Sequence, residues 1–330
     1  MEVKNIVNRS LLAVLVAGAS SSIAHAEETP FTFITNWYAQ AEHGGFYQAK
    51  EQGLYKQQGL DVTIKMGGPQ VNNTQLLVAG KADCIITDVI GVMMSQKRGL
   101  PIQLVGTSFQ YDPTVVITHA DVKNLGDLNE DNTILISTSS HSSWWPWAKK
   151  QFGFTDAMTR PYTFNVQPFV MNDKVAQQGF MTSEPFALEK TGVSFNVYSI
   201  GQEGYPSYGN SLACSNNVIE EHPEKVKAFL QASMSGWKSY LNDPSLGNKA
   251  IKLANPSMAD DQIAYSVEKL RTSEIVTGGD AETKGIGIIT PERMEKTWQM
   301  AVSNGLFAAE DVNLEEVYTT AFINDVKVTP

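Results

Sequence analysis

The sequence predicts an α/β fold with two lobes, each built on a mostly parallel sheet, and with two crossovers of the chain between them. Short apolar segments alternate with helical patterns from Phe31 to Val105, and a second series of the same style begins near Tyr111. Strands separated by helices of this length are typical of parallel sheets with crossover helices. The chain has 330 residues, more than one hydrophobic core usually serves, so two lobes are expected.

The first series contains four expected strands with helices between them. Apolar runs place the strands at residues 31–37, 61–66, 84–86 and 102–105. Helical spacing of the apolar positions places the helices at residues 45–52, 72–79 and 91–98. Gly53 and Gly59 separate helix from strand, and Gly67-Gly68-Pro69 forms a turn.

The second series is shorter and gives way to helices. Its strands are expected at residues 115–117, 134–136 and 180–181, and its helices at 144–152 and 185–190. Glycines and prolines cluster at 201–209, and helices follow, one starting at Pro223 and another capped by Thr290. We expect lobe I to comprise residues 27–110 and 206–330, and lobe II residues 111–205. A cleft between two such lobes suits hinge closure around a small ligand.

The first residues have the features of a secretory signal. Lys4 and Arg9 precede a short apolar stretch, and small residues lead to Ala24-His25-Ala26, an A-x-A-type cleavage site. The apolar stretch is well short of the ~20 residues that a membrane-spanning helix needs. We therefore expect residues 1–26 to be a signal peptide. The mature chain would be soluble in a bacterial periplasm or an equivalent space, without membrane insertion.

The charge of the chain restricts its partners. It has 25 Lys and Arg against 35 Asp and Glu, a formal net charge of −10. Contacts with nucleic-acid phosphates need clustered Lys and Arg, so we expect no nucleic-acid partner.

The two cysteines, Cys84 and Cys214, both stand in apolar stretches. A disulfide needs Cα atoms within about 7 Å, which a sequence cannot establish. Because free cysteine is often fully buried, we expect two buried thiols rather than a disulfide.

Catalytic and cofactor motifs are absent from the sequence. There is no GxSxG, HExxH or GxxxxGK[ST] motif, and no GxGxxG after a strand. The five histidines are scattered, and no pair has the spacing of metal ligands. We therefore expect no cofactor and no metal, and a binding protein rather than an enzyme.

Several motifs resemble those of one family of transport proteins. They are Asn36-Trp37-Tyr38, Glu42-His43-Gly44-Gly45-Phe46-Tyr47, Gly53-Leu54-Tyr55, Gly80-Lys81-Ala82-Asp83 and Gly285-Ile286-Gly287. Over nearly all of its expected mature length the chain resembles the ABC-transporter substrate-binding proteins related to thiamine-pyrimidine precursor, sulfonate and nitrate binders. The resemblance implies a two-lobed periplasmic binding protein of type II, whose partners are a membrane permease and its ATPase. It leaves the ligand open.

The first two motifs match the thiamine-pyrimidine branch of that family best. By that resemblance Trp37, with Asn36 beside it, would stack on a flat heterocycle, and His43 would lie at the edge of the pocket. An aromatic side chain at a strand end offers the π-face that such stacking needs. The alternatives are a wall residue for Trp37 and a hydrogen-bonded structural histidine for His43.

A related group with the same fold is a self-consuming enzyme that makes the thiamine pyrimidine. It resembles this chain around Trp37 and His43, but it carries a run of closely spaced cysteines. Here the corresponding region is Ala213-Cys214-Ser215-Asn216, with one cysteine. This departure and the expected signal peptide argue against a thiamine pyrimidine synthase-like enzyme, which stays as an alternative.

Ligands of open α/β sheets bind at the carboxyl ends of the strands. None of the seven segments expected there contains Lys or Arg: 36–47, 67–73, 87–88, 106–113, 137–145, 182–186 and 203–208. Their acids, among them Asp88 and Glu184, suit a neutral or cationic heterocycle, above all a thiamine-type pyrimidine precursor. For both acids the alternative is a role at a helix start, capping for Asp88 and first-turn charge for Glu184.

One segment is compatible with an anionic ligand. Ser137 and Thr138 begin a serine-rich run before a helix, where N–H groups could hold taurine, another aliphatic sulfonate or nitrate; capping is the alternative. Trp144 lies in the same segment, and Tyr205 and Tyr208 near the second crossover could close over a ligand or pack in the hinge. The ten candidate ligand-binding residues are therefore Asn36, Trp37, His43, Asp88, Ser137, Thr138, Trp144, Glu184, Tyr205 and Tyr208.

Overall fold

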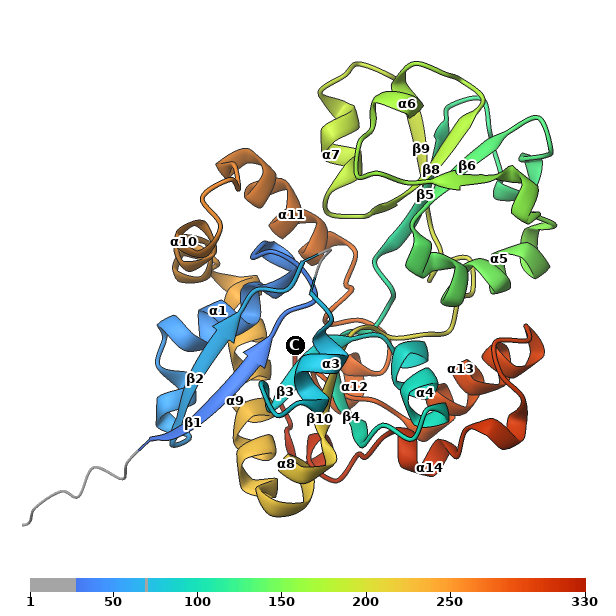
Figure 1. Cartoon of the computed structure of the whole chain (residues 1–330). Coiled ribbons are helices and arrows are strands. Elements are labelled where there is room, and N and C mark those ends of the chain that lie inside the picture. The colour runs from blue at the N-terminus through green and yellow to red at the C-terminus, as the bar shows by residue number, and fades with distance from the viewer. Residues whose placement is uncertain (1–27, 69–70) are drawn as a thin grey trace, which may run out of the picture.

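The computed structural model describes residues 28–68 and 71–330. Its strands form two five-stranded sheets that lie in separate parts of the molecule, with helices around each (Figure 1). The predicted α/β fold class is confirmed. The predicted signal peptide, residues 1–26, lies outside the described residues.

The sheet of lobe I has the strand order β2-β1-β3-β10-β4. Its strands are β1 (Thr29–Ile34), β2 (Leu60–Lys65), β3 (Cys84–Thr87), β4 (Ile102–Phe109) and β10 (Gly209–Ser215). The four strands predicted for the first series are confirmed to within a few residues. The strand β10 was not predicted, because its Gly-Asn-Ser start lacks the β-branched and aromatic residues that mark strands.

The sheet of lobe II has the strand order β7-β6-β8-β5-β9. Its strands are β5 (Thr114–His119), β6 (Thr133–Ile136), β7 (Thr159–Pro161), β8 (Val175–Phe180) and β9 (Phe195–Ser199). The predicted strands match β5, β6 and the end of β8. The two that were missed, β7 and β9, are the edge strands of this sheet.

The strands β5 and β10 run against their neighbours. Each is antiparallel to both adjacent strands, and the remaining pairings are parallel. In each sheet the other four strands therefore run in one direction, and the expectation of mostly parallel sheets is confirmed, with one antiparallel strand in each. The reason lies in the path of the chain: β5 and β10 are the strands by which it enters each lobe from the other, so they begin at the junction where the other strands end.

The chain passes between the sheets twice. The first crossover, residues 110–113, connects β4 to β5, and the second, residues 200–208, connects β9 to β10. The expected lobe boundaries, after residues 110 and 205, fall within these connections. The division into lobes at those residues stays a prediction.

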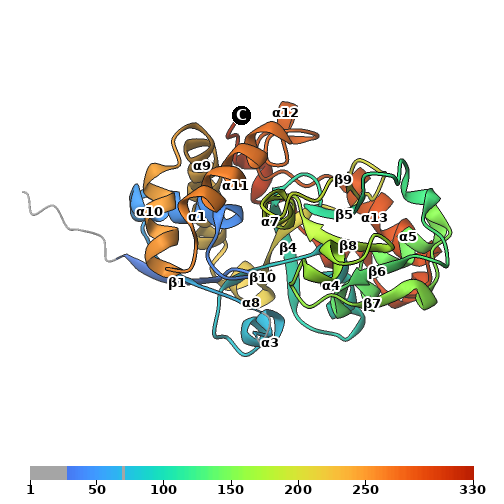
Figure 2. The same ribbon diagram turned by 90° about the horizontal axis from the view of Figure 1, so that it is seen from above.

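Helices surround both sheets (Figure 2). They are α1 (Gly44–Glu51), α2 (Leu54–Gln57), α3 (Asn73–Val78), α4 (Val89–Lys97), α5 (Trp145–Phe152), α6 (Gln167–Val170), α7 (Glu184–Glu189), α8 (Asn216–Glu221), α9 (Pro223–Asn242), α10 (Ser245–Ala254), α11 (Asp260–Thr272), α12 (Ala281–Lys284), α13 (Pro291–Ser303) and α14 (Leu314–Val317). Short 3-10 helices are η1 (Ala41–His43), η2 (Leu125–Asp127), η3 (Thr138–Ser142), η4 (Asp156–Met158), η5 (Ala309–Asp311) and η6 (Ile323–Asp325). Within the described residues, no helix is both long and apolar enough to cross a membrane.

Two glycines let α1 lie against α9. A Cβ atom on Gly44 would come within 2.1 Å of the Tyr240 ring, and one on Gly45 within 2.3 Å of the Trp237 ring. Both aromatic side chains are fully buried on α9. The Gly44-Gly45 pair is therefore needed for this close packing, which holds the preceding residues Glu42 and His43 at the amino end of α1.

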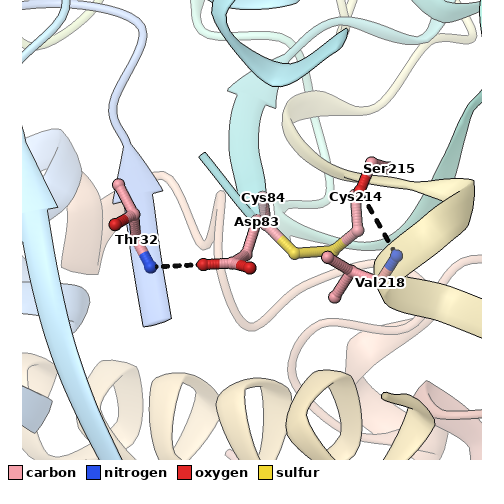
Figure 3. Close-up of a disulfide and its surroundings, with 6 residues drawn as sticks. All are labelled: Thr32, Asp83, Cys84, Cys214, Ser215 and Val218. Atoms are coloured by element: carbon pink, nitrogen blue, oxygen red, sulfur yellow. Dashed lines mark hydrogen bonds between the residues drawn. A yellow bond between two sulfur atoms is a disulfide. The ribbon is translucent and has the colours of Figure 1, made fainter. Parts of the chain in front are cut away.

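The two cysteines form a disulfide, which corrects the expectation of free thiols. Cys84 on β3 lies directly opposite Cys214 on β10, with their Cα atoms 4.0 Å apart (Figure 3). The expectation failed because the strand that carries Cys214 was not recognised, and 130 residues separate the two positions. The bridge ties the strand that follows the second crossover to the middle of the lobe I sheet.

Candidate ligand-binding site

The carboxyl ends of the strands from both sheets meet at the junction between the lobes. In lobe I the last residues of β3 and β4 pair with the first residues of β10. In lobe II the last residues of β8 and β9 pair with the first residues of β5. Because β5 and β10 begin at the crossovers, these strand ends face the junction, where open α/β sheets bind their ligands.

His43 and Asn36 belong to one buried hydrogen-bond network. The Nε2 atom of His43 lies 2.9 Å from Asn36 Oδ1, and the Asn36 amide donates to Asn210 Oδ1 at 3.2 Å. The Asn210 amide in turn donates to the Glu42 carbonyl at 3.3 Å. His43 is 1% exposed, and burial lowers its pKa to about 3, so the imidazole is neutral. These are the contacts of a structural histidine, and a ligand contact of His43 stays a prediction.

Trp37 meets an aromatic side chain from the other lobe. Its ring centroid lies 5.1 Å from that of Phe164, with the ring planes 39° apart, and 5.6 Å from that of Tyr38, in an edge-to-face contact. Trp37 is half-buried, and Phe164 is 56% exposed. Two partly open rings, one from each lobe, form the kind of π-surface on which a flat ring stacks. Phe164 follows the missed strand β7, which is why the sequence did not point to it.

Two carboxylates and a tyrosine gather at the hinge side of the junction. Asp88 caps α4 by accepting from the Gly91 N–H at 2.7 Å, and Asp112 accepts from the Thr114 N–H at 2.8 Å. The Asp88 side chain is exposed, yet the surrounding protein raises the pKa of its carboxyl by desolvation. Burial raises the pKa of Asp112 to about 6, and the charge of Asp88 adds to this shift. The capping role expected as the alternative for Asp88 is thus present.

Tyr205, on the second crossover, lies near both of these acids. It is 3% exposed and packs against Trp147, with ring centroids 5.3 Å apart. Burial raises the pKa of its hydroxyl well above 10, and the charges of Asp112 and Asp88 add to the effect. The structure therefore brings together Asp88 and Tyr205, two of the ten candidates, with Asp112, which was among the strand-end acids but not among the candidates.

Glu42 of η1 makes a contact between the lobes. Its Oε1 atom accepts a hydrogen bond from the hydroxyl of Thr182, a residue that follows β8 in the sequence. The Thr182 carbonyl accepts from Gln262 Nε2 at 2.9 Å and from Ser266 Oγ at 2.8 Å, both on α11. Glu42 is 2% exposed; burial raises the pKa of its carboxyl, the Thr182 hydrogen bond opposes this, and the Glu184 charge adds to it. Only its position among the strand-end acids pointed to Glu42.

Glu184 opens α7 and is bound within lobe II. Its Oε1 accepts from the Tyr162 hydroxyl at 2.8 Å, and its Oε2 accepts from the Phe180 N–H at 2.7 Å. Each carboxylate oxygen can still accept a further hydrogen bond. The first-turn role expected as the alternative is present, and the role toward a ligand stays a prediction.

The serine run forms a capped 3-10 turn. Ser137 accepts from the Ser140 N–H at 3.3 Å, and the Ser137 N–H donates to Gln178 Oε1 at 2.7 Å. The Ser140 hydroxyl also donates to Gln178 Oε1, at 2.7 Å. Thr138 is exposed. Two of the N–H groups in the expected anion site are thus already bonded within lobe II.

Two further candidates lie in the packed interior. Trp144 is 3% exposed and meets Trp145 edge to face, with ring centroids 5.8 Å apart. Tyr208 is fully buried; its hydroxyl donates to Asp280 Oδ2 at 3.1 Å and accepts from the Thr290 N–H at 3.0 Å. Both side chains contact the protein interior. For Tyr208 this agrees with the alternative role given above, which is packing in the hinge.

Two cavities lie at the junction. The hinge cavity, of about 280 Å³, lies beside both crossovers and is lined by Tyr111, Tyr205, Pro206 and Arg293 among others. The interlobe cavity, of about 460 Å³, lies between η1, α7 and the start of α11. Figure 2 shows α7 and α11 facing each other across the junction. Of the ten candidates, Tyr205 is the one that lines either cavity.

Cationic side chains are present at both cavities. Arg293 and Lys296 line the hinge cavity, and Lys190 lines the interlobe cavity. The strand-end segments gave no sign of them, because all three lie on or beside helices. Lys190 is paired with Asp261 at 2.8 Å. Among residues 28–68 and 71–330, no group of three or more His, Cys, Asp or Glu is arranged to hold a metal ion.

The chain is similar to a group of solute-binding and pyrimidine-forming proteins. The profile of the NMT1/THI5-like family matches residues 40–246. The riboflavin-binding protein RibY of Chloroflexus aurantiacus is 22% identical over 305 residues, covering 88% of this chain and 85% of that protein. The 4-amino-5-hydroxymethyl-2-methylpyrimidine phosphate synthase of Schizosaccharomyces pombe is 25% identical over 240 residues, covering 64% of this chain and 66% of the enzyme.

Solved structures with the same fold include periplasmic binding proteins and also an enzyme, the desulfurization enzyme DSZB, which has a TM-score of 0.59 at 12% identity, covering 90% of this chain and 98% of that chain. The aliphatic sulphonate binding protein SsuA of Escherichia coli has a TM-score of 0.66 at 14% identity, covering 87% of this chain and 91% of that chain. The nitrate-binding protein NrtA of Synechocystis has a TM-score of 0.66 at 12% identity, covering 91% and 88%. At these identities the likeness shows the fold alone, and it confirms the predicted periplasmic-binding-protein fold.

Proposed function

We propose that this chain, which belongs to the NMT1/THI5-like family, is the solute-binding component of an ABC importer. It would work in the periplasm, capture a small neutral or cationic heterocycle between its lobes, and deliver it to a membrane permease with its ATPase. The preferred ligand is a thiamine-type pyrimidine precursor. The chain would act without a cofactor and would release its ligand unchanged.

The observation that carries this proposal is the chemistry of the strand ends at the junction. Trp37 and Phe164, one from each lobe, are partly exposed and contact each other with their ring planes 39° apart, so they supply aromatic surface at the junction, while Glu42, Asp88 and Asp112 supply carboxyl groups whose pKa values are raised. An aminopyrimidine combines a flat ring with N–H donors, so it matches both features.

The relatives support a planar heterocycle. RibY is named for binding riboflavin, and the synthase from Schizosaccharomyces pombe for forming a phosphorylated aminopyrimidine. Both names describe flat nitrogen heterocycles, although the two proteins differ in what they do. Riboflavin therefore belongs among the ligands to be tested.

A ligand screen by thermal unfolding tests the proposal. The exported, purified chain is heated with 4-amino-5-hydroxymethyl-2-methylpyrimidine, riboflavin, taurine or nitrate over a range of concentrations. A ligand that binds only the folded state raises Tm as its concentration rises. We expect the pyrimidine to raise Tm and taurine and nitrate to leave it unchanged. A rise with taurine or nitrate and none with either heterocycle would contradict the proposed cargo.

The synthase-like alternative makes a different prediction. A self-consuming enzyme that uses His43 as the source of ring atoms would leave that residue converted. Mass spectrometry of the chain after incubation with pyridoxal phosphate and iron would then show a modified His43. We expect an unmodified chain and no pyrimidine product, because Cys214, the one cysteine of the corresponding region, is held in a disulfide.

A further inference from the structure

The interlobe cavity is formed by both lobes together. Gln40 and Glu42 of lobe I line one side, and Thr182, Phe186 and Lys190 of lobe II line the other. The start of α11 closes it through Gln262. Its volume of about 460 Å³ is in the range of ligand pockets. A molecule inside it would touch both lobes, and so would be held most tightly when the lobes are closed.

Glu42 brings an unsatisfied carboxylate oxygen to this cavity. Its Oε1 atom is bonded to Thr182, but within the described part of the chain its Oε2 atom has no hydrogen-bond partner. Buried polar atoms in native structures are nearly always paired with protein, water or ligand. An unpaired, buried carboxylate oxygen beside a cavity therefore marks a position for a donor.

The charges around the cavity favour a cationic donor. The negative charge of Glu184 acts on Glu42. The cation that lines the cavity, Lys190, is paired with Asp261 at 2.8 Å and lies over the Phe186 ring at 4.1 Å, so its charge is already partnered. Among the described residues that line the cavity, no unpaired cation faces Glu42. Burial raises the pKa of its carboxyl, and a bound cation would oppose this shift by favouring the charged carboxylate.

We propose that the interlobe cavity is a subsite for a protonated amine carried by the solute, with Glu42 as its counter-charge. This inference rests on the proposed function and extends it, because it names the substituent that the solute carries beside its ring. The ammonium group donates to Glu42 Oε2. Since Oε1 is bonded to Thr182, the same carboxylate links the bound cation to the contact between the lobes.

The test uses two pyrimidines that differ in one group. They are 4-amino-5-aminomethyl-2-methylpyrimidine, which carries a protonated amine at neutral pH, and 4-amino-5-hydroxymethyl-2-methylpyrimidine, which does not. Their affinities for the full exported chain are measured by isothermal titration calorimetry. We expect the aminomethyl compound to bind at least about tenfold more tightly, as a charge-assisted hydrogen bond in a buried site predicts.

Glu42→Gln keeps the shape of the side chain and removes its charge. We expect this variant to bind the two compounds within about threefold of each other, a difference well below that of a charge-assisted bond. The matched control is Glu189→Gln, on an exposed position of α7, which should keep the wild-type preference. Thermal unfolding verifies that both variants are folded.

The outcomes separate this inference from the proposed function. Equal binding of the two compounds by the wild type, or a preference that survives in a folded Glu42→Gln variant, overturns the amine subsite and leaves the pyrimidine cargo standing. Binding of neither compound overturns the pyrimidine cargo, and the subsite falls with it. The wild-type comparison needs no variant, so the test holds even if Glu42→Gln does not fold.

Discussion

The two cavities at the junction differ in how their polar groups are satisfied. In the hinge cavity Arg293 donates to the carbonyls of Pro206 at 2.8 Å and Ser207 at 3.4 Å, and Asp280 accepts from the hydroxyls of Tyr208 and Thr290, each at 3.1 Å. In the interlobe cavity the Oε2 atom of Glu42 has no such partner among the described residues.

This difference indicates different roles. The Arg293 guanidinium lies 4.2 Å from the Tyr208 ring centroid and 5.4 Å from that of Tyr111, so one side chain of α13 contacts both crossovers. The hinge cavity thus lies among groups that hold the crossovers against lobe I. In the interlobe cavity the Oε2 atom of Glu42 remains free to accept a hydrogen bond from a ligand. The predictions that follow test the comparison, from the largest expected effect to the smallest.

The largest effect is expected at the disulfide that anchors the strand after the second crossover. Replacing both Cys84 and Cys214 by alanine should lower the free energy of unfolding by about 3–5 kcal/mol, since the bridge closes a long loop in the unfolded chain. Urea denaturation of the variant measures this, and reduced wild-type chain is the control. A loss below about 1 kcal/mol would contradict an anchoring role, since a disulfide typically contributes about 2–4 kcal/mol to the free energy of unfolding.

Arg293→Ala should lower the free energy of unfolding by about 2–3 kcal/mol. It leaves the carbonyls of Pro206 and Ser207 without their charged donor and removes the stacking on two tyrosines. Lys296→Ala is the control on the same helix; its exposed pair with Glu292 should contribute no more than about 1 kcal/mol. If Arg293→Ala abolished solute binding without lowering stability, the roles of the two cavities would be reversed.

Trp37→Ala should weaken solute binding by about 1–3 kcal/mol, the range for a truncated aromatic anchor. Trp37→Phe keeps a ring opposite Phe164 and should recover most of the loss. Calorimetric titration of both variants with the pyrimidine measures this. Equal affinities for wild type and Trp37→Ala would assign Trp37 to the wall between lobe and helix.

The smallest effect is expected in the pH dependence that Asp112 contributes, because this side chain is partly exposed and solvent screens its charge. Its pKa rises from the ordinary 3.8 to about 6 on folding, so the folded chain holds this proton more tightly than the unfolded chain. The stability contributed by Asp112 is therefore complete below pH 4 and is lost as the pH rises toward 6. Asp112→Asn should remove this part of the slope. Unfolding measured between pH 4 and pH 7 tests it, and identical slopes for both chains would contradict it.

Local pattern was enough to predict most of the strands and helices. The strands β1 to β6 and the helices that start at Pro223 and Pro291 follow from periodicity, turn residues and caps, which all lie within a few residues of each other. The local sequence pattern did not predict β7, β9 and β10. The first two are sheet-edge strands, and the third begins with residues that do not favour strands.

The sequence by itself therefore determined the fold class, the acids and aromatics at the strand ends, the helix cap at Asp88 and the first-turn position of Glu184. Tertiary structure alone decided the pairings: Cys84 with Cys214, Trp37 with Phe164, and Glu42 with Thr182. The physical reason is the distance along the sequence between the residues that pair. A periodic pattern records which face of an element is buried, whereas more than 100 residues separate the partners of each pair, and only the path of the chain through one or both crossovers brings them together.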